Sequence, residues 1–258
     1  MNFKFTILGC GSSFGVPRAD GNWGKCDPTE VKNNRTRCSA LISFMNKNIL
    51  IDTSPDLRIQ LIKNKVTNID AVLYSHLHAD QTHGINDLRV FYMNNKKKIN
   101  IYADIFTRNY LQSNFSYCFK NKYGYPPILD LKKIKKNLIF KIKNKTLNIK
   151  SIPVKHGPIE SLSFIINKKC GYASDVNEIY KKDLNNFKNL EFFIIDCLRL
   201  KKHPSHFNLD EVLNLVKILI PKKTILTNLH SDLDYNYLLK NLPNNIRPAY
   251  DGLSLNIK

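Results

Sequence analysis

The fold is decided by one segment of the chain, Tyr74-Ser75-His76-Leu77-His78-Ala79-Asp80-Gln81-Thr82-His83-Gly84. It continues the apolar run of residues 69–75, which has the composition of a short buried strand. His76 and His78 lie two residues apart, so in an extended segment both imidazoles point to one side and suit one metal ion. Asp80 adds a hard oxygen, useful for a second ion or for holding an attacking water. The alternative is a polar loop whose histidines only cap the following helix.

Three further residues of ligand type each stand where a strand pattern ends. His156 follows residues 152–155, Asp175 follows 172–174 and His230 follows 226–229. A single histidine in such a place is more often a hydrogen-bonded structural residue than a ligand. Because all three occur downstream of the His-x-His-x-Asp segment, we favour a metal cluster over the capping loop.

Strand and helix patterns alternate along the chain without a linker or low-complexity gap. Strands are expected at residues 4–8, 40–44, 48–52, 138–142, 147–153, 162–166, 171–174, 192–196, 224–228 and 253–257. Helices are expected at 84–94, at 104 to about 120 with Asp104 as its cap, at 209–219 and at 235–241. We expect a single domain over residues 1–258, folded as a layered α/β sandwich.

Composition indicates a soluble protein of a reducing compartment. No apolar run approaches the roughly 20 residues of a membrane span, and the N-terminus lacks the pattern of a secretory signal. The six cysteines are scattered, with no Cys-x-x-Cys pair, which argues against a disulfide scaffold or a cysteine-built zinc site. We therefore expect a cytoplasmic location and no association with a membrane.

The formal net charge of +19 has two interpretations. It could attract phosphate-bearing ligands or nucleic acid over long distances. Lysines are, however, spread over the whole chain and form no basic stripe interleaved with aromatic residues. We therefore favour a general compositional bias, and nucleic acid is a partner that the sequence permits but does not favour.

These residues give the chain a resemblance to the metallo-β-lactamase superfamily over essentially its whole length. More narrowly, it resembles the branch that contains the cyclic phosphodiesterases of phosphonate catabolism, on the segments 9–13, 15–18, 52–58, 84–89 and 203–206. The resemblance implies an αββα four-layer sandwich and two divalent metal ions per chain, zinc or manganese. It implies that the first ion is bound by His76, His78 and His156, that Asp175 bridges, and that Asp80 and His230 bind the second. Asp52 would support the site without binding metal, and a homodimer is compatible with the resemblance.

Two features depart from the family pattern. A second histidine usually follows the aspartate, but Gln81 stands there, and a neutral amide oxygen is a weaker zinc ligand. The second site is therefore expected to be weak, and His83, which is displaced by two positions, is interpreted as a supporting residue. The related enzymes also carry a structural zinc bound by cysteines near the N-terminus. Only Cys26 remains here, so we expect no such site.

The expected activity is hydrolysis of small phosphodiesters, cyclic ones included, by a metal-bound hydroxide. Asp80 and His206 are the catalytic candidates, with His206 as general acid or phosphate contact. Arg199 is the candidate substrate-binding residue, because a guanidinium can grip a phosphate with two hydrogen bonds. Arg58 and Arg89 are interpreted as structural ion-pair residues.

Two other functions stay open. One is a nuclease resembling the tRNA 3′-end processing endonucleases, although only residues 106–131 leave room for the arm that such enzymes use to grip tRNA. The other is a metal-binding protein that has lost hydrolysis through the change at Gln81.

Overall fold

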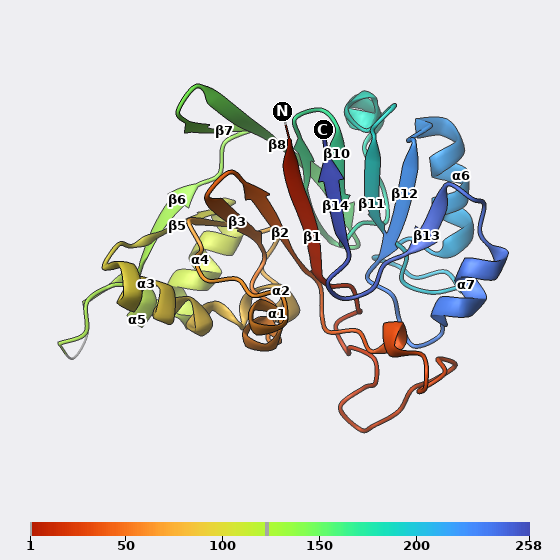
Figure 1. Ribbon diagram of the computed structural model, residues 1–258, viewed down its shortest axis with the longest axis horizontal. Helices are drawn as coiled ribbons and strands as arrows, with labels where there is room; N and C mark the ends of the chain where they lie inside the picture. The colour runs from red at the N-terminus through yellow and green to blue at the C-terminus, as the bar shows by residue number, and fades with distance from the viewer. Residues whose placement is uncertain (1, 122–123) are drawn as a thin grey trace.

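The computed structural model describes residues 2–121 and 124–258, and it contains two seven-stranded sheets packed face to face (Figure 1). The first sheet has the order β14 (Ser254–Ile257), β1 (Phe3–Gly9), β2 (Ser39–Phe44), β3 (Lys47–Ile51), β4 (Ala71–Leu73), β5 (Ile99–Ala103), β6 (Leu129–Lys133). The second has the order β13 (Ile246–Pro248), β12 (Lys223–Thr227), β11 (Phe192–Asp196), β10 (Cys170–Ala173), β9 (Ile159–Ile166), β8 (Lys145–His156), β7 (Asn137–Ile142).

Parallel strands lie next to each other in both sheets, and their carboxyl ends lead into the loops that matter below. In the first sheet β3, β4, β5 and β6 are parallel neighbours. In the second, β10, β11, β12 and β13 are parallel neighbours. Ligands of open α/β sheets bind beyond the carboxyl ends of such strands, so both sheets can contribute to one site.

The main core lies between the two sheets. Side chains of the first sheet, such as Phe5 and Ile42, are fully buried in one cluster with Phe164 and Ile194 of the second. Alternate residues of each strand face this layer, as the period of two in a strand requires.

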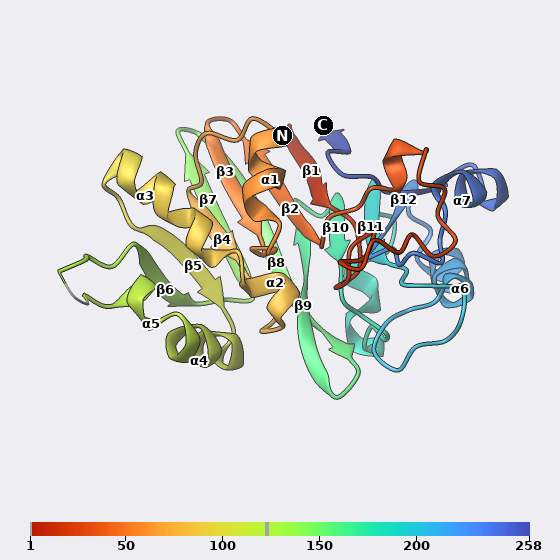
Figure 2. The same cartoon turned by 90° about the horizontal axis from the view of Figure 1, so that it is seen from below.

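Helices cover the outer face of each sheet (Figure 2). Over the first sheet lie α1 (Leu57–Lys63), α2 (Ala79–Thr82), α3 (Arg89–Asn95), α4 (Ile105–Asn114) and α5 (Ser116–Phe119), with the short 3-10 turn η2 (Ile85–Leu88). Over the second lie α6 (Leu209–Leu219) and α7 (Tyr235–Asn241). Two further 3-10 turns are η1 (Val31–Asn33) and η3 (Lys181–Asn186). The expected αββα four-layer sandwich is confirmed.

Most expected elements are present, and two expected helices are corrected. The helix expected at 84–94 is split into η2 and α3, and the helix expected at 104–120 is split into α4 and α5 at Phe115. The ring of Phe115 packs edge-on against His83 and near Tyr110, so a tertiary contact interrupts the helical pattern there. Asp104 caps α4 as expected, accepting a 2.7 Å hydrogen bond from the amide of Thr107.

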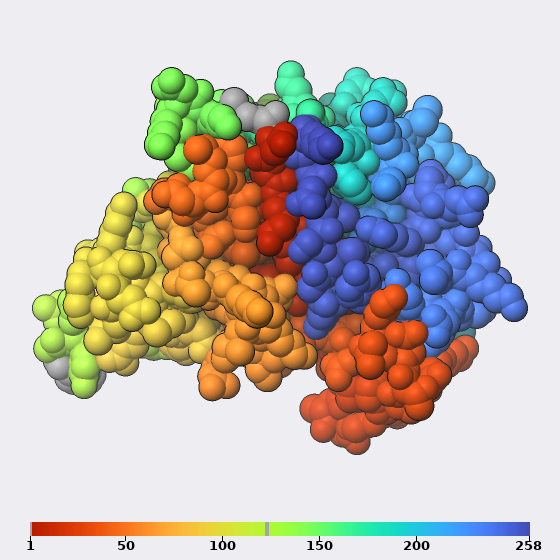
Figure 3. Space-filling model, in the orientation of Figure 1, coloured from red at the N-terminus to blue at the C-terminus, as the bar shows by residue number. Residues whose placement is uncertain are grey.

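The segment between β1 and β2 crosses from the first sheet to the C-terminal part of the second. Figure 3 shows it in orange-red against the blue C-terminal part of the chain. Asn33 anchors it, donating a 2.6 Å hydrogen bond to Asp234 and accepting a 2.8 Å bond from the amide of Tyr235. The beginning of this segment, Ser12 to Phe14, lies over the carboxyl edge of the sheets, beside the site described next.

Among the described residues, none of the helices combines the length and the apolar character that a membrane span requires.

Candidate metal centre and active site

Ligand-type side chains converge where strands of both sheets end. His76 and His78 follow β4, and Asp80 and Gln81 lie on the short helix α2. From the second sheet, His156 ends β8, and Asp175 follows β10. Distant parts of the chain therefore meet at one edge of the sandwich, with one sheet on each side.

Three histidines form the tightest cluster. Nε2 of His76 lies 2.9 Å from Nδ1 of His78, and Nε2 of His156 lies 3.3 Å from the same Nδ1. Nitrogen ligands at about 2.0–2.1 Å from one tetrahedral ion lie about 3.3 Å apart, so the spacing fits a single ion. Two of the three remaining ring nitrogens are held from outside: Nδ1 of His76 by the hydroxyl of Ser75 at 3.0 Å, and Nδ1 of His156 by the carbonyl of Ser205 at 2.7 Å.

The protonation of these rings suits metal binding. Because Nδ1 of His156 faces a carbonyl, it carries the proton and leaves Nε2 with its lone pair. Burial lowers the pKa of His76 to about 3, and burial also lowers the pKa of His78 and of His156. Neutral imidazole is the form that binds a divalent ion, so the donor set fits the metal that the fold implies.

Two carboxylates lie beside the histidines, with Gln81 between them. Nε2 of Gln81 lies 3.3 Å from Oδ2 of Asp80 and 3.3 Å from Oδ2 of Asp175. Burial, together with the charge of Asp175, raises the pKa of Asp80 to about 6. Burial alone would also raise the pKa of Asp175, but the imidazoles of His76, His156 and His206 outweigh it and lower that pKa.

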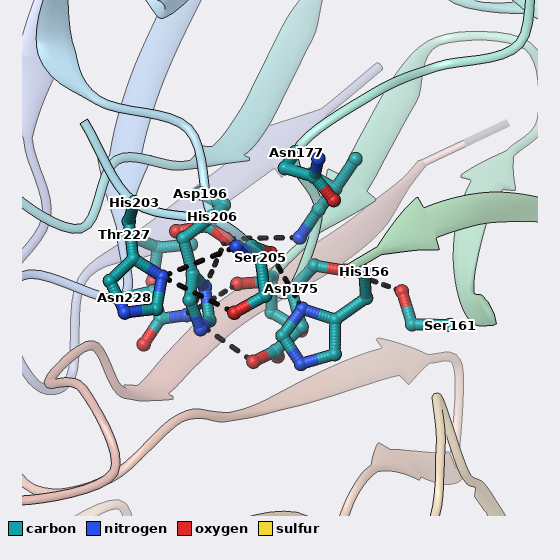
Figure 4. A network of polar contacts seen from close by, with 12 residues as sticks. His156, Ser161, Asp175, Asn177, Asp196, His203, Ser205, His206, Thr227 and Asn228 are labelled. Atoms are coloured by element: carbon teal, nitrogen blue, oxygen red, sulfur yellow. Dashed lines mark hydrogen bonds and ion pairs between the residues drawn. The ribbon is translucent and has the colours of Figure 1, made fainter. Parts of the chain in front are cut away.

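His206 faces the same cluster and is held from behind by Asp196 (Figure 4). Its Nδ1 lies 2.6 Å from Oδ2 of Asp196, a fully buried carboxylate at the end of β11. Burial would lower the pKa of His206, but Asp196 outweighs it and raises that pKa to about 9. With Nδ1 bound to Asp196, Nε2 is the ring nitrogen left for other partners. His156, Asp175 and His206 form a second group of ligand atoms within 4.8 Å of one another.

A small pocket opens over these residues. It has a volume of about 290 Å³ and is lined by Ser12, Ser13, Phe14, His78, Asp80, His156, Asp175, Leu198, Arg199, His203, Ser205, His206, Asn228 and His230. His230 thus reaches the pocket, although neither group of closely spaced ligand atoms among the described residues includes it or Asp80. Arg199 also lines the pocket, with two of its donors used on the carbonyls of Lys201 and Lys202.

Comparison with known proteins places this site in a family. The sequence profile described as the beta-lactamase superfamily domain matches residues 47–228, more than half of the chain. This chain belongs to the beta-lactamase superfamily. The matched segment contains the His-x-His-x-Asp residues, His156, Asp175 and Asn228, but ends before His230.

Solved structures show which part of the superfamily the chain resembles. A crystal structure described as a new diphosphatase from the PhnP family is 28% identical, covers 100% of this chain and 98% of its own, and superposes with a TM-score of 0.88. The short form of human tRNase Z is 14% identical with a TM-score of 0.70, covering 98% of both chains, and shares the fold. The expected metallo-β-lactamase fold, with a resemblance to the PhnP branch, is confirmed.

One curated relative is a longer protein. A protein of Porphyromonas gingivalis (strain ATCC BAA-308 / W83) named octanoyltransferase is 30% identical over 252 residues, which are 96% of this chain and 50% of that protein. The chain therefore spans about half the length of this relative.

Within the superfamily site, Asp52 and Gly84 support the residues of the sequence motif. Oδ1 of Asp52 accepts a 2.7 Å hydrogen bond from the amide of Ser75, which fixes the backbone just before His76. Gly84 lies so close to the chain that an added Cβ would meet the carbonyl oxygen of Ser54 at 2.0 Å. Any larger residue there would push the loop after the His-x-His-x-Asp segment away from the sheet.

Four residues discussed from the sequence lie outside the pocket. Nε2 of His83 lies 2.9 Å from the hydroxyl of Tyr110, away from the ligand cluster. Arg58 and Arg89 do not line the pocket, and Arg89 lies over the ring of Tyr125. Cys26 contacts the carbonyl of Ser231 and the guanidinium of Arg35.

Sequence reasoning missed Asp196 and Asn228. Asn228 follows β12 and donates hydrogen bonds to the carbonyl of Ser174 at 2.8 Å and to Oδ1 of Asp175 at 3.3 Å. Asp196 could have been found from the sequence, because it is a carboxylate that ends an otherwise apolar strand. Asp52 and Asp175 likewise stand just after apolar strands. Asn228 carried no comparable signal, because its role depends on the order of the strands in the sheet, where β11 separates β12 from β10.

Proposed function

We propose that this chain is a metal-dependent phosphodiesterase acting on small phosphodiesters, cyclic ones included. The observation that carries the proposal is the joining of two features in one small pocket: the three-histidine cluster, and a histidine that is fixed by a buried carboxylate and faces it. The similarity to a diphosphatase of the PhnP family supports chemistry at phosphorus.

We propose His76, His78, His156 and Asp175 as ligands of a first divalent ion, and Asp80, Asp175 and His230 as ligands of a second. Zinc suits the nitrogen-rich first position, and manganese suits the oxygen-rich second one. When bound, such ions supply Lewis acidity, which activates water and offsets the charge of the phosphoryl oxygens.

The protein groups would bind, orient and protonate the substrate. Arg199, which donates from Nε and Nη2 to the carbonyls of Lys201 and Lys202, would contact a phosphoryl oxygen at the rim of the pocket with its remaining N–H groups. Asp80 would hold the attacking water by accepting its hydrogen bond. His206 would give the proton on Nε2 to the leaving alkoxide, while Asp196 keeps its ring in place.

The size of the pocket favours a small substrate over a folded RNA. About 290 Å³ lies at the low end of ligand-site volumes, which run from about 300 to 1,000 Å³. A small phosphodiester needs no surface beyond the residues that line the pocket.

A substrate panel tests the proposal. Purified protein with Mn²⁺ or Zn²⁺ should hydrolyse bis-p-nitrophenyl phosphate and small cyclic phosphodiesters, and leave p-nitrophenyl phosphate and a β-lactam nearly untouched. An octanoyl thioester is the acyl control that the name of the longer relative suggests. A clear preference for the thioester or the β-lactam would overturn the proposal. Cleavage of precursor tRNA without turnover of small diesters would favour the nuclease, and loss of all turnover with metal bound would favour a protein that has lost hydrolysis.

A further inference from the structure

We propose that the amide of Gln81 makes the two metal positions unequal: it bridges Asp80 and Asp175 when only the histidine position is filled, and turns its oxygen to a hard cation when one enters the second position. This inference rests on the proposed metal site, and is independent of which ester the site hydrolyses.

Gln81 occupies the point where two like charges meet. Its Nε2 donates to Oδ2 of both Asp80 and Asp175, at 3.3 Å each, and its side chain is fully buried. Two neighbouring carboxylates in a buried site repel each other unless a donor or a cation lies between them. The NH2 group of Gln81 therefore does part of what a second ion would do.

Hydrogen bonds hold the backbone of Gln81 in place on both sides. Its amide donates to the carbonyl of His78 at 3.1 Å, and its carbonyl accepts a 2.7 Å hydrogen bond from the amide of Thr53. Only the terminal amide of the side chain is left as an adjustable group at this position.

The other end of that amide lacks a partner. Oε1 of Gln81 is buried and accepts no hydrogen bond among the described residues. Turning the amide would place Nε2 where Oε1 lies now, and would cost the two bonds to the carboxylates. Rotation of the amide is favourable only if a cation binds Oε1, which then faces Asp80 and Asp175.

The second position would then hold an ion through oxygen donors and at most one imidazole. Asp80, Asp175 and Oε1 of Gln81 are hard ligands, and His230 is partly exposed, with its Nδ1 3.5 Å from Oδ1 of Asp232. Hard oxygen sites favour Mn²⁺ or Mg²⁺ over Zn²⁺ relative to nitrogen-rich sites. The histidine position, with three neutral imidazoles, should keep zinc.

Metal titration tests the inference without reference to turnover. Calorimetry on the chelator-stripped full chain should show one tight zinc site and a second site at least about 10-fold weaker. Gln81→His should narrow this gap, because it replaces a neutral oxygen by an imidazole. Two equally tight zinc sites in the native protein, unchanged in Gln81→His, would overturn the inference. Equally tight sites in a protein that hydrolyses phosphodiesters would overturn this inference and leave the proposed function standing. Unequal sites in a protein that hydrolyses no phosphodiester would support this inference and overturn the proposed function.

Thermal unfolding of a second variant tests the bridge itself. Gln81→Glu places a third carboxylate between Asp80 and Asp175, so the Tm of the metal-free variant should lie below that of the metal-free native protein. Adding Mn²⁺ should raise the Tm of the variant more than it raises the Tm of the native protein. Gln60→Glu is the matched control, because Gln60 is also buried, donates from Nε2 to Thr36 and Arg37, and has an Oε1 that accepts no hydrogen bond from any described residue. The Tm of Gln60→Glu should also be lowered, but Mn²⁺ should not raise it more than it raises the Tm of the native protein. Equal responses of the two variants to Mn²⁺ would overturn the inference.

Discussion

At the scale of single residues, His206 combines a fixed ring with one free nitrogen. The 2.6 Å contact of Nδ1 with Asp196 sets the orientation of the ring. A histidine held in this way can present a proton at a constant position, which is what general acid catalysis requires.

Replacing His206 by Ala should therefore affect substrates according to their leaving groups. For diesters of poor alkoxide leaving groups, kcat should fall by roughly 100-fold or more, because the departing oxygen needs a proton. For p-nitrophenyl esters the loss should be much smaller, because p-nitrophenolate leaves without protonation.

Steady-state kinetics on both substrate types decides between roles for His206. His203→Ala is a suitable control, because His203 lines the same pocket but its Nδ1 faces the hydroxyl of Ser205, at 3.2 Å, instead of a buried carboxylate. Equal losses on both substrate types in His206→Ala would indicate a binding or structural role instead.

At the scale of secondary-structure elements, α1 shows why some elements escaped sequence analysis. It has only seven residues, and its N-cap Asp56 makes no capping hydrogen bond with its side chain. That side chain instead forms an ion pair with Arg37, with both oxygens 2.7–2.8 Å from guanidinium nitrogens. The side chain of Asp56, which would usually cap the helix, thus binds a residue 19 positions earlier in the sequence. No local sequence pattern reveals such a contact.

The Arg37–Asp56 pair should stabilise the fold in a pH-dependent way. Burial would raise the pKa of Asp56, but the hydrogen bonds from Arg37 outweigh it and lower that pKa. A carboxyl whose pKa is lower in the folded state stabilises it above the unfolded pKa of about 3.9, and this stabilisation is lost as the pH falls through the folded pKa.

Asp56→Asn should accordingly lower the free energy of unfolding by about 1–3 kcal/mol at pH 7, and by progressively less as the pH falls below the unfolded pKa of about 3.9. Urea denaturation at several pH values measures this difference. Asp130→Asn, which removes the exposed 3.4 Å pair with Lys132, should change little at any pH. A difference between native protein and Asp56→Asn that stays constant from pH 7 to pH 3 would contradict the prediction.

Strands with strong alternation were predicted well, and helices that depend on tertiary contacts were not. The pair β2 and β3 reads as a hairpin because two short apolar runs, at residues 40–44 and 48–52, flank the turn at residues 45–47. The break between α4 and α5 at Phe115 depends on contacts of its ring with His83 and Tyr110. His83 lies on a distant segment of the chain, and Tyr110 lies on α4. Propensity and periodicity are local, so they describe such breaks poorly.

At the scale of the whole molecule, the site joins the two sheets. His76 and His78 extend from the first sheet, and His156 and Asp175 from the second, so their order along the chain could be read from the sequence but their meeting could not. It depends on the stacking of the sheets through the central core. The position of Asp196 at the end of an apolar strand could be read from the sequence, but its role could not, because it acts through His206 on a different loop.

A metal ion bound between the sheets should therefore stabilise the whole fold. A ligand that binds only the folded state adds RT ln(1 + [L]/Kd), about 4 kcal/mol when its free concentration is 1,000 times Kd. For a domain of this size each kcal/mol corresponds to a shift of about 2–4 °C, so removing metal with a chelator should lower Tm by on the order of 10 °C.

Scanning calorimetry with zinc and with chelator measures this shift, and His156→Ala provides the decisive comparison. His156 contributes the nitrogen that links the second sheet to His78, so its loss should remove most of the zinc-dependent part of the shift. His83→Ala, which alters a histidine outside the ligand cluster, should keep that part intact. If chelation leaves Tm unchanged in the native protein, or if zinc stabilises His156→Ala as strongly as the native chain, the ion does not hold the sheets together through this cluster.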